Sequence, residues 1–460
     1  DGKLIGAVAW GWPFEKEPIT GITPIRAMLE ALSVMESPQA QAAPAARSWT
    51  ASRPFVVGGT RYSSAAVVAA GVKPAPGVLP LRPVMTPVNC SGFGPQTLKL
   101  VAQKLGPLGL QPLAGGGAKA DPVPVELEPG AAVGVHLMEG DLDMTGIGTV
   151  TWRQGDRLLA FGHPMMQLGR VNMPLATAWI HDFIPSYMRA DKMGSAMTDV
   201  GSLQADTAWS IGGRVGPRAP LIPARLEIVD QSRHYTRVFN VKVFDQPRLT
   251  PIVLSVAISQ ALEAVYNPGY EGTVRTHFQV RGKRGASLAH DNQYSVQGSP
   301  TDMAIGEVAA IMQILEDNRW EPQGVSELVY RAELTSRDET LMIEKAYTEE
   351  TVARAGKPLH LHVLLRPDGG ELQERVFTLN MPPDLPKGTI RIGIGPGDDA
   401  LYFRARLGIM LPRFESLAEV ASFVGRMEQN RQLCVVAALP DEGVMAGSTR
   451  LMRVPPSIAA

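Results

Sequence analysis

The sharpest local feature of the sequence is a lone histidine in a turn, His163, within Ala160-Phe161-Gly162-His163-Pro164. The residues before it read as the end of a strand, and Gly162 allows the backbone to turn tightly beside the imidazole. Histidine is the usual general base of enzymes because its unperturbed pKa, about 6.5, lies close to neutral pH. The same pattern is typical of a strand-end histidine whose ring binds a backbone carbonyl, so both interpretations stay open.

Two aspartates further along the chain, Asp199 and Asp206, could orient an imidazole as the acid of a Ser-His-Asp triad does. They frame Val200-Gly-Ser-Leu203, and Ser210-Ile-Gly-Gly213 with Arg214 follows them. Such aspartates also commonly cap turns and bind their own backbone. The candidate catalytic residues are therefore His163, Asp199 and Asp206.

No obvious nucleophile accompanies these residues. The chain contains no G-x-S-x-G nucleophile elbow, and the nearest candidates are Ser91 and Ser195, which we predict to be turn residues. The stretch from Gly393 to Gly397 (GIGPG) lacks the spacing and the lysine of a phosphate loop, so we interpret it as a turn.

Potential metal ligands occur only as isolated pairs. Asp141 and Asp143 share one face of a predicted strand, and so do His360 and His362. Two ligands at i, i+2 spacing do not make a metal site, and the sequence suggests no third ligand. We therefore expect no metal and no other cofactor.

The composition limits what kind of protein positions these residues. A chain of 460 residues predicts two to four domains, and its 46 glycines and 38 prolines favour short strands and many turns over long helices. The net charge of −1 gives no reason to expect nucleic acid as a partner, and no apolar run is long enough to span a membrane. Cys90 and Cys434 are compatible with one disulfide or with two free thiols.

Closely spaced short strands predict a β-barrel or β-sandwich between about residues 123 and 282. Apolar residues at helical spacing predict helices at 25–35, 98–105, 252–265 and 302–318. Evenly spaced strands after residue 325 suggest a small Ig-like sandwich, closed by a helix at 416–427 and a strand at 432–439.

Three stretches together resemble the SpoIVB serine peptidase family. The first runs from Asp1 (DGKLIGAV) to Leu29 and includes PITGITPIRAML. The second joins Thr145-Gly-Ile-Gly-Thr-Val-Thr151 with the segment around His163 and is similar to the histidine block of that family. The third, from Val200 to Gly213, is similar to the S-x-F-G-I-x-G block that follows it. The resemblance covers roughly residues 1–32 and 131–285.

The resemblance implies a mainly β fold: a chymotrypsin-like double β-barrel, permuted and incomplete at its N-terminus, followed by a C-terminal Ig-like β-sandwich with a few helices. Together, the resemblance and the patterns above predict five regions: 1–36, strand and helix completing the serine-side barrel; 37–122, a linker and a small α/β insert; 123–300, the histidine-side barrel with a helix; 301–322, a connecting helix; 323–460, an Ig-like β domain with a closing helix and strand.

The chain departs from the family in two respects. The G-K-x-I-G-A-V segment comes last in the sporulation peptidases but first here, as in large bacterial envelope proteins that carry a rearranged domain and a similar C-terminal extension. The G-M-S-G-S-P motif, which holds the nucleophile shortly before that segment in the family, does not occur in residues 1–460.

The resemblance therefore transfers one catalytic role, that of His163 as general base. The serine, its oxyanion hole and the triad acid are expected on an upstream N-terminal fragment, separated by self-processing or by a boundary of the chain. This chain alone is expected to be inactive, its substrates would be proteins or peptides, and its location would be periplasmic, cell-envelope or extracellular. The alternative is a non-catalytic secreted or envelope scaffold with a vestigial peptidase domain.

Overall fold

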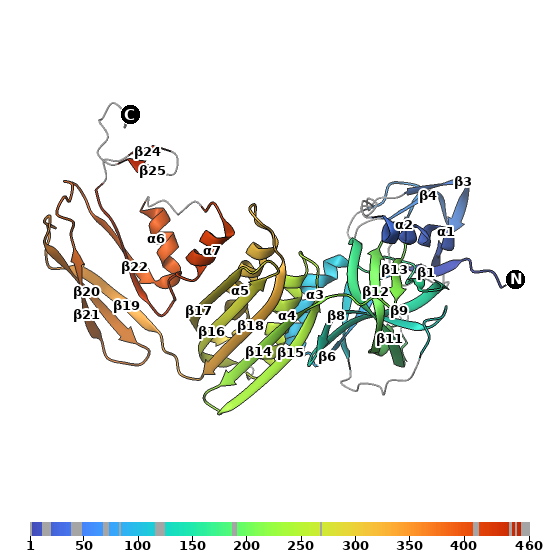
Figure 1. The fold of residues 1–460 in the computed structure, drawn as a ribbon, viewed down its shortest axis with the longest axis horizontal. Helices are drawn as coiled ribbons and strands as arrows, with labels where there is room; N and C mark the ends of the chain where they lie inside the picture. Colours follow the sequence, from blue (N-terminus) through green and yellow to red (C-terminus); the bar gives the residue numbers. More distant parts are fainter. Residues whose placement is uncertain are drawn as a thin grey trace. The chain divides into compact units, whose positions relative to one another are not determined.

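The computed structural model of the chain divides into two compact units (Figure 1). The first comprises Asp1–Leu226, Val238–Ala264 and Val325–Leu328, and the second comprises Glu227–Arg237, Val265–Gly324 and Val329–Ala460. The structure describes residues 2–11, 20–37, 48–67, 73–81, 84–115, 125–185, 191–266, 269–407, 414–440, 444–446 and 449–451. Strands predominate in the described residues of both units, which confirms the predicted mainly β class.

The first unit contains the strands that precede α4, although the turn between the last two, with the adjoining residues of both strands, belongs to the second unit. They are β1 (Gly6–Gly11), β2 (Thr20–Pro24), β3 (Ser48–Val57), β4 (Thr60–Val67), β5 (Val78–Leu81), β6 (Thr86–Ser91), β7 (Leu110–Gly115), β8 (Ala132–Gly140), β9 (Asp143–Gln154), β10 (Arg157–Ala160), β11 (Gly169–Ile184), β12 (Asp191–Asp206), β13 (Ile211–Val215), β14 (Leu221–Asp230) and β15 (Tyr235–Phe244). The helices are α1 (Ile25–Met28), α2 (Glu30–Glu36), α3 (Pro95–Leu105), η1 (Gly106–Leu108) and α4 (Thr250–Glu263).

Six antiparallel strands of this unit close into a hydrogen-bonded ring. Their order is β8-β11-β12-β13-β10-β9, and β9 pairs again with β8. Closure leaves none of the six with a free edge along the paired segments. Apolar side chains at most 2% exposed line these strands, among them Val135, Ile147, Leu159, Leu175 and Leu203. The ring lies within the predicted histidine-side region, 123–300, and covers residues 132–215 of it, whereas a second barrel is not seen in the described residues and stays a prediction.

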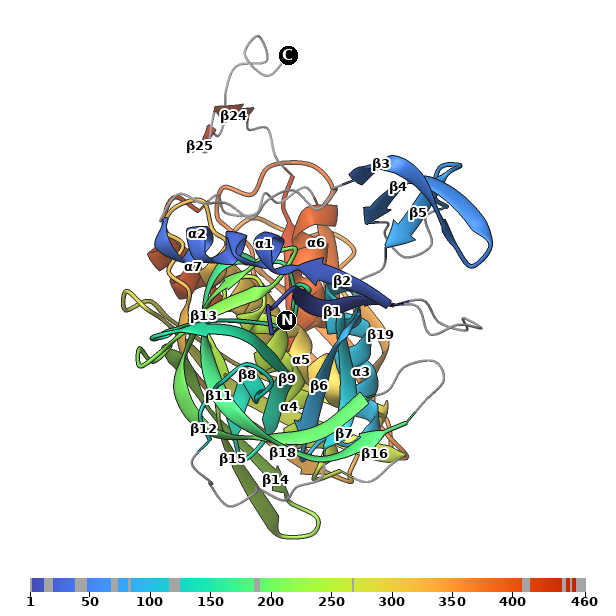
Figure 2. The same cartoon turned by 90° about the vertical axis from the view of Figure 1, so that its right-hand side faces the viewer.

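The N-terminal segment packs against this ring (Figure 2). The expected single helix at 25–35 is divided at Leu29 into α1 and α2. Met28, Ala31 and Met35 are its buried side chains, Ile25 and Leu32 pack partly buried against the same cluster, and Leu29 is exposed. Gly212 makes the contact possible, because a Cβ there would lie 2.8 Å from the Met35 sulfur. Strands β1 and β2 pair with each other in a sheet of two.

The glycines and the serine of Ser210-Ile-Gly-Gly213 thus have a packing role. Ser210 donates a hydrogen bond from its hydroxyl to the Met28 carbonyl, 2.9 Å away, at the end of α1. A Cβ at Gly213 would lie 2.8 Å from the Ser202 carbonyl oxygen of the neighbouring strand. This motif therefore holds the N-terminal helices on the ring.

Helix α3 begins against a carboxylate from α4. Glu263 accepts hydrogen bonds from the backbone N–H groups of Gln96 (2.9 Å) and Thr97 (2.7 Å), and from the Thr97 hydroxyl. These N–H groups belong to the first turn, which has no partners inside the helix. The carboxylate also lies at the positive end of the α3 dipole, so the contact stabilises the start of α3 and links it to the end of α4.

The second unit bears out most of the strands predicted after residue 265. Its elements are β16 (Tyr270–Gly282), β17 (Ser287–Gly298), α5 (Thr301–Glu316), β18 (Val325–Thr335), β19 (Leu341–Thr348), β20 (Pro358–Pro367), β21 (Gln373–Asn380), β22 (Arg391–Pro396), η2 (Gly397–Asp399), α6 (Ala400–Arg406), α7 (Leu417–Val424), β23 (Leu433–Ala438), β24 (Val444–Ala446) and β25 (Thr449–Leu451). A three-stranded sheet, β19-β20-β21, and a two-stranded sheet, β22-β23, occupy the predicted Ig-like region, and the sandwich itself stays a prediction.

Two expectations from composition can be compared with the structure directly. Cys90 and Cys434 are both free thiols, which decides between the two alternatives that the sequence left open. In the part of the chain that the structure describes, no helix has the length and apolar character needed to cross a membrane. The Pro/Ala/Gln-rich stretch 37–46 and the glycine-rich stretch 114–120 lie largely outside the described residues.

Candidate functional site

His163 follows a strained turn at the end of β10. Phe161 and Gly162 both have positive φ angles, 72° and 80°, and Phe161 is one of three described non-glycine residues with this conformation. The Phe161 ring fits over Gly148, where a Cβ would lie 2.0 Å from a ring carbon. It contacts the His163 imidazole at a centroid distance of 5.5 Å. Gly162, which allows the turn, and Gly148, which leaves room for the Phe161 ring, therefore determine the position of His163.

The hydrogen bond of His163 defines its neutral tautomer. Its Nδ1 lies 2.8 Å from the carbonyl oxygen of Pro164. A carbonyl oxygen can only accept, so Nδ1 carries the proton and, in the neutral ring, Nε2 carries the lone pair. This is the tautomer of a general base that acts through Nε2. The structure thus contains the backbone carbonyl partner expected for a strand-end histidine. This hydrogen bond is also compatible with a role of His163 as general base.

The His163 side chain lines a cavity of about 490 Å³. Strand β1 contributes Gly6, Ala7 and Val8 to the wall, and β9 contributes the stretch from Ile147 to Thr151. The volume falls within the range of small-ligand and peptide side-chain sites, about 300–1,000 Å³. His163 itself is only 8% exposed, and it is among the residues that line this cavity.

Lys192, at the start of β12, supplies a positive charge to the same cavity. Its Nζ donates to the Thr149 hydroxyl at 2.6 Å, and burial lowers the pKa of its ammonium group. Sequence reasoning did not select this lysine, because no local motif surrounds it and its partner lies 43 positions earlier.

Asp206 binds the loop that follows His163. Its two carboxylate oxygens accept hydrogen bonds from the backbone N–H groups of Met165 and Met166, both at 2.8 Å, and of Leu168 at 3.2 Å. Asp206 is fully buried, and this burial raises its pKa to about 6 against the lowering effect of the N–H donors. The carboxylate therefore shapes residues 165–168, and a catalytic part for it stays a prediction.

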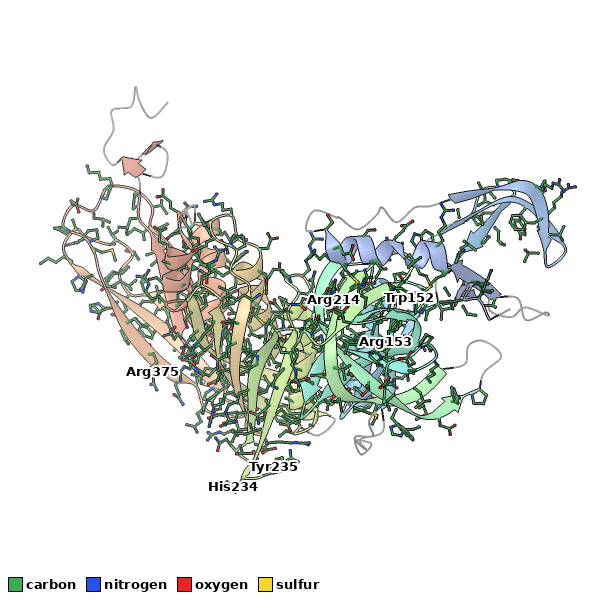
Figure 3. The ribbon with its side chains drawn as sticks, turned by 45° about the vertical axis from the view of Figure 1, so that its right-hand side comes forward. Trp152, Arg153, Arg214, His234, Tyr235 and Arg375 are labelled. Carbon is green, nitrogen blue, oxygen red and sulfur yellow. The ribbon has the colours of Figure 1, made fainter. Side chains whose placement is uncertain are left out.

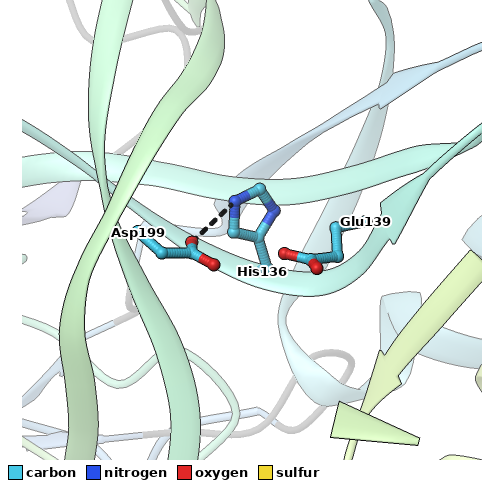
Figure 4. Close-up of side chains that lie close together, drawn as sticks. All are labelled: His136, Glu139 and Asp199. Atoms are coloured by element: carbon cyan, nitrogen blue, oxygen red, sulfur yellow. Dashed lines mark ion pairs between the residues drawn. The ribbon is translucent and has the colours of Figure 1, made fainter. Parts of the chain in front are cut away.

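Asp199 lies beside a different imidazole, that of His136 on β8 (Figure 4). Its Oδ1 is 3.5 Å from His136 Nε2, and Glu139 completes a cluster whose ligand atoms lie within 4.8 Å of one another. Burial and the neighbouring Glu139 raise the pKa of Asp199. The structure thus assigns Asp199 and Asp206 to two separate environments.

The other residues singled out from the sequence have individual partners. The Ser195 hydroxyl lies 2.9 Å from Nε2 of His181 in the β11–β12 hairpin, on an exposed surface. Ser91 ends β6 and is not a turn residue as predicted, because it pairs with β9. Arg214, labelled in Figure 3, forms an exposed ion pair with Asp156.

The two i, i+2 pairs do not converge on a common ligand position. His360 pairs with Glu350 at 2.7 Å and His362 with Glu374 at 2.9 Å. Asp141 accepts from the backbone N–H of Asn240, and Asp143 contacts His136.

Comparison with known proteins identifies no relative: no protein-family model, curated protein or solved structure matches the chain. The functional interpretation therefore depends on the residues and the geometry described above.

Proposed function

We propose that this chain forms the histidine-bearing part of a SpoIVB-like serine endopeptidase, with His163 as its general base. The nucleophilic serine comes from a G-M-S-G-S-P segment that is not among residues 1–460. The observation that carries the proposal is the shared cavity: His163 and the first strand, β1, line the same hollow. In the family that the sequence resembles, the serine lies a few residues before the segment that matches Asp1, and β1 is part of that segment.

The contact between the two elements is close. A Cβ added to Gly162 would lie 2.6 Å from the Ala7 Cβ, so only glycine lets the turn before His163 approach β1 this closely. A serine held a few residues before β1 would enter the wall of the cavity on the side that Gly6, Ala7 and Val8 form. This supports a composite site made from two segments.

The proposed reaction is acyl transfer. The serine oxygen attacks the peptide carbonyl while Nε2 of His163 takes the hydroxyl proton, and the imidazolium then gives this proton to the leaving amine. Water repeats the sequence to release the acid. The Pro164 carbonyl holds Nδ1–H throughout, and the ammonium group of Lys192 favours negative charge in the cavity.

Fluorophosphonate labelling of the natively purified protein, resolved on a denaturing gel, tests this proposal. We expect label on a separate, smaller band, and we expect His163→Ala to abolish it. His181→Gln is the matched control, because this exposed imidazole also bonds a serine but lies outside the residues that line the cavity. The control should label like the wild type.

Two results would overturn the proposal. Label on the 460-residue chain that disappears in Ser195→Ala would assign the nucleophile to the β11–β12 hairpin. No label on any band, beside a serine hydrolase that labels normally, would favour the alternative of a non-catalytic envelope or secreted scaffold.

A further inference from the structure

The cluster of His136, Glu139 and Asp199 has the composition and geometry of a metal site. Among the described residues it is the group of three or more such side chains whose ligand atoms converge. It combines one imidazole nitrogen with two carboxylates, a donor set that suits zinc and other transition metals better than magnesium or calcium. None of the three lines the His163 cavity.

The distance between the ligand atoms fits one ion. His136 Nε2 and Asp199 Oδ1 are 3.5 Å apart. Two ligands at roughly 2.0–2.1 Å from a tetrahedral zinc ion are separated by about 3.4 Å. The observed separation is longer than an ordinary hydrogen bond and close to this ligand–ligand distance.

The buried atoms of the cluster are incompletely satisfied. Asp199 Oδ1 is buried and has no hydrogen-bond partner among the described residues, although it faces the imidazole. Only 7% of the His136 side chain is exposed. A buried carboxylate oxygen that makes no hydrogen bond costs free energy, which a bound cation would offset.

The opposite side of the imidazole is arranged as in known zinc sites. His136 Nδ1 lies 2.8 Å from the Thr145 hydroxyl and 3.2 Å from Asp143 Oδ2, and the hydroxyl also contacts Asp143. A metal-bound histidine usually gives its other N–H to a carboxylate, which fixes the tautomer and leaves the second nitrogen for the ion. Asp143 would serve this purpose.

The cluster joins strands that are not neighbours in the ring. His136 and Glu139 are on β8 and Asp199 is on β12, with β11 between them in the pairing order. Gly134 shares a face of β8 with His136, and a Cβ there would lie 3.6 Å from Ala196 of β12. This face of β8 therefore faces β12 across the ring. We propose that His136, Glu139 and Asp199 bind a zinc ion that ties β8 to β12 across the ring.

The test is zinc binding by the metal-stripped 460-residue chain. Titration calorimetry with ZnCl₂ should give one site per chain, and zinc but not magnesium should raise the melting temperature. The nearly isosteric variants Asp199→Asn and Glu139→Gln, and His136→Gln, should each weaken zinc binding by about 10- to 100-fold or more. His277→Gln is the matched control, because His277 is an exposed histidine paired with Asp291 elsewhere, and it should bind like the wild type.

Cobalt provides a readout that does not depend on stability. Co²⁺ in the wild type should give the intense visible absorption of a four-coordinate ion, and the three cluster variants should lose it while circular dichroism verifies their fold. Absence of zinc binding by the wild type would overturn the proposal and identify the cluster as an ion pair. Unchanged binding in Asp199→Asn and Glu139→Gln would overturn it equally.

Discussion

Ala7 packs so closely against Gly162 that a Cβ added at position 162 would lie only 2.6 Å from the Ala7 Cβ. One residue thus connects the turn that carries His163 with strand β1. The contact joins segments more than 150 positions apart in the sequence, and it unites the histidine with the element next to which the proposed nucleophile belongs.

Gly162→Ala should therefore disturb both stability and the site. The φ of 80° strains any L-residue, at a cost of about 1–3 kcal/mol, and the clash with Ala7 adds to it. Urea unfolding should show a larger loss for this variant than for Gly155→Ala, whose φ is 62° but whose Cβ would meet nothing within 4 Å. Equal losses would mean that β1 accommodates the added methyl group without cost, which contradicts the tight contact.

Asp206→Asn should remove a pH dependence of stability. The pKa of Asp206 is about 6 in the fold against an ordinary value of 3.8, so the folded state binds the proton more tightly. The stability from this group is greatest below pH 4 and falls, by roughly 3 kcal/mol, as the pH rises to about 6. The excess stability of wild type over Asp206→Asn should accordingly be larger at pH 4.5 than at pH 7, as urea unfolding at both values can measure. An excess that shrinks on acidification would imply a lowered pKa.

Glu263→Gln should destabilise the pair of helices α3 and α4. The change removes the negative charge from the N-terminus of α3 and one of the strong acceptors for its first-turn N–H groups, which predicts a loss of about 1–2 kcal/mol. Thermal unfolding provides the measurement. Glu271→Gln, at an exposed position of a strand, should change the melting temperature little.

The effect of zinc should increase with pH. Burial lowers the pKa of His136, but the hydrogen bond and charge of Asp143, together with Asp199 and Glu139, outweigh burial and raise it. Two cations also act on the cluster: Arg218 on Asp199, and Lys242 on Glu139, with which it pairs at 3.1 Å. Protons therefore compete with the metal for Nε2, and the zinc-induced rise in melting temperature should be smaller at pH 6 than at pH 8.

The metal-free protein should show the opposite pH dependence. The wild type should be more stable than His136→Gln by the largest amount at low pH, and this difference in unfolding free energy should diminish as the pH rises through the raised pKa of His136.

Local patterns predicted much of the fold. Strands β8, β9 and β10, and helices α4 and α5, lie close to where alternation and helical spacing indicated them. The sequence predicted short strands between residues 123 and 282 and not strands as long as β11 and β12, because several register shifts interrupt their pairing and break the alternation on which strand prediction depends.

The candidate site was predicted only in part, and the reason is distance along the chain. His163 stands in a recognisable turn, whereas Lys192 and His136 acquire their significance from partners on other strands. His136 sits within a buried apolar run, and Asp199 reaches it only because the ring brings β12 opposite β8. Asp206 was selected for its residue type, but its environment became visible only with the loop wrapped around it.

The loop after His163 has a consequence for amide hydrogen exchange. Residues 165–168 are not part of a strand, yet several of their backbone N–H groups donate hydrogen bonds to the single carboxylate of Asp206. We therefore expect these amides to exchange together and not one at a time, since release of the carboxylate exposes all of them. The segment that carries the turn of His163 should therefore exchange as part of β12, with the slow, concerted opening of the ring itself.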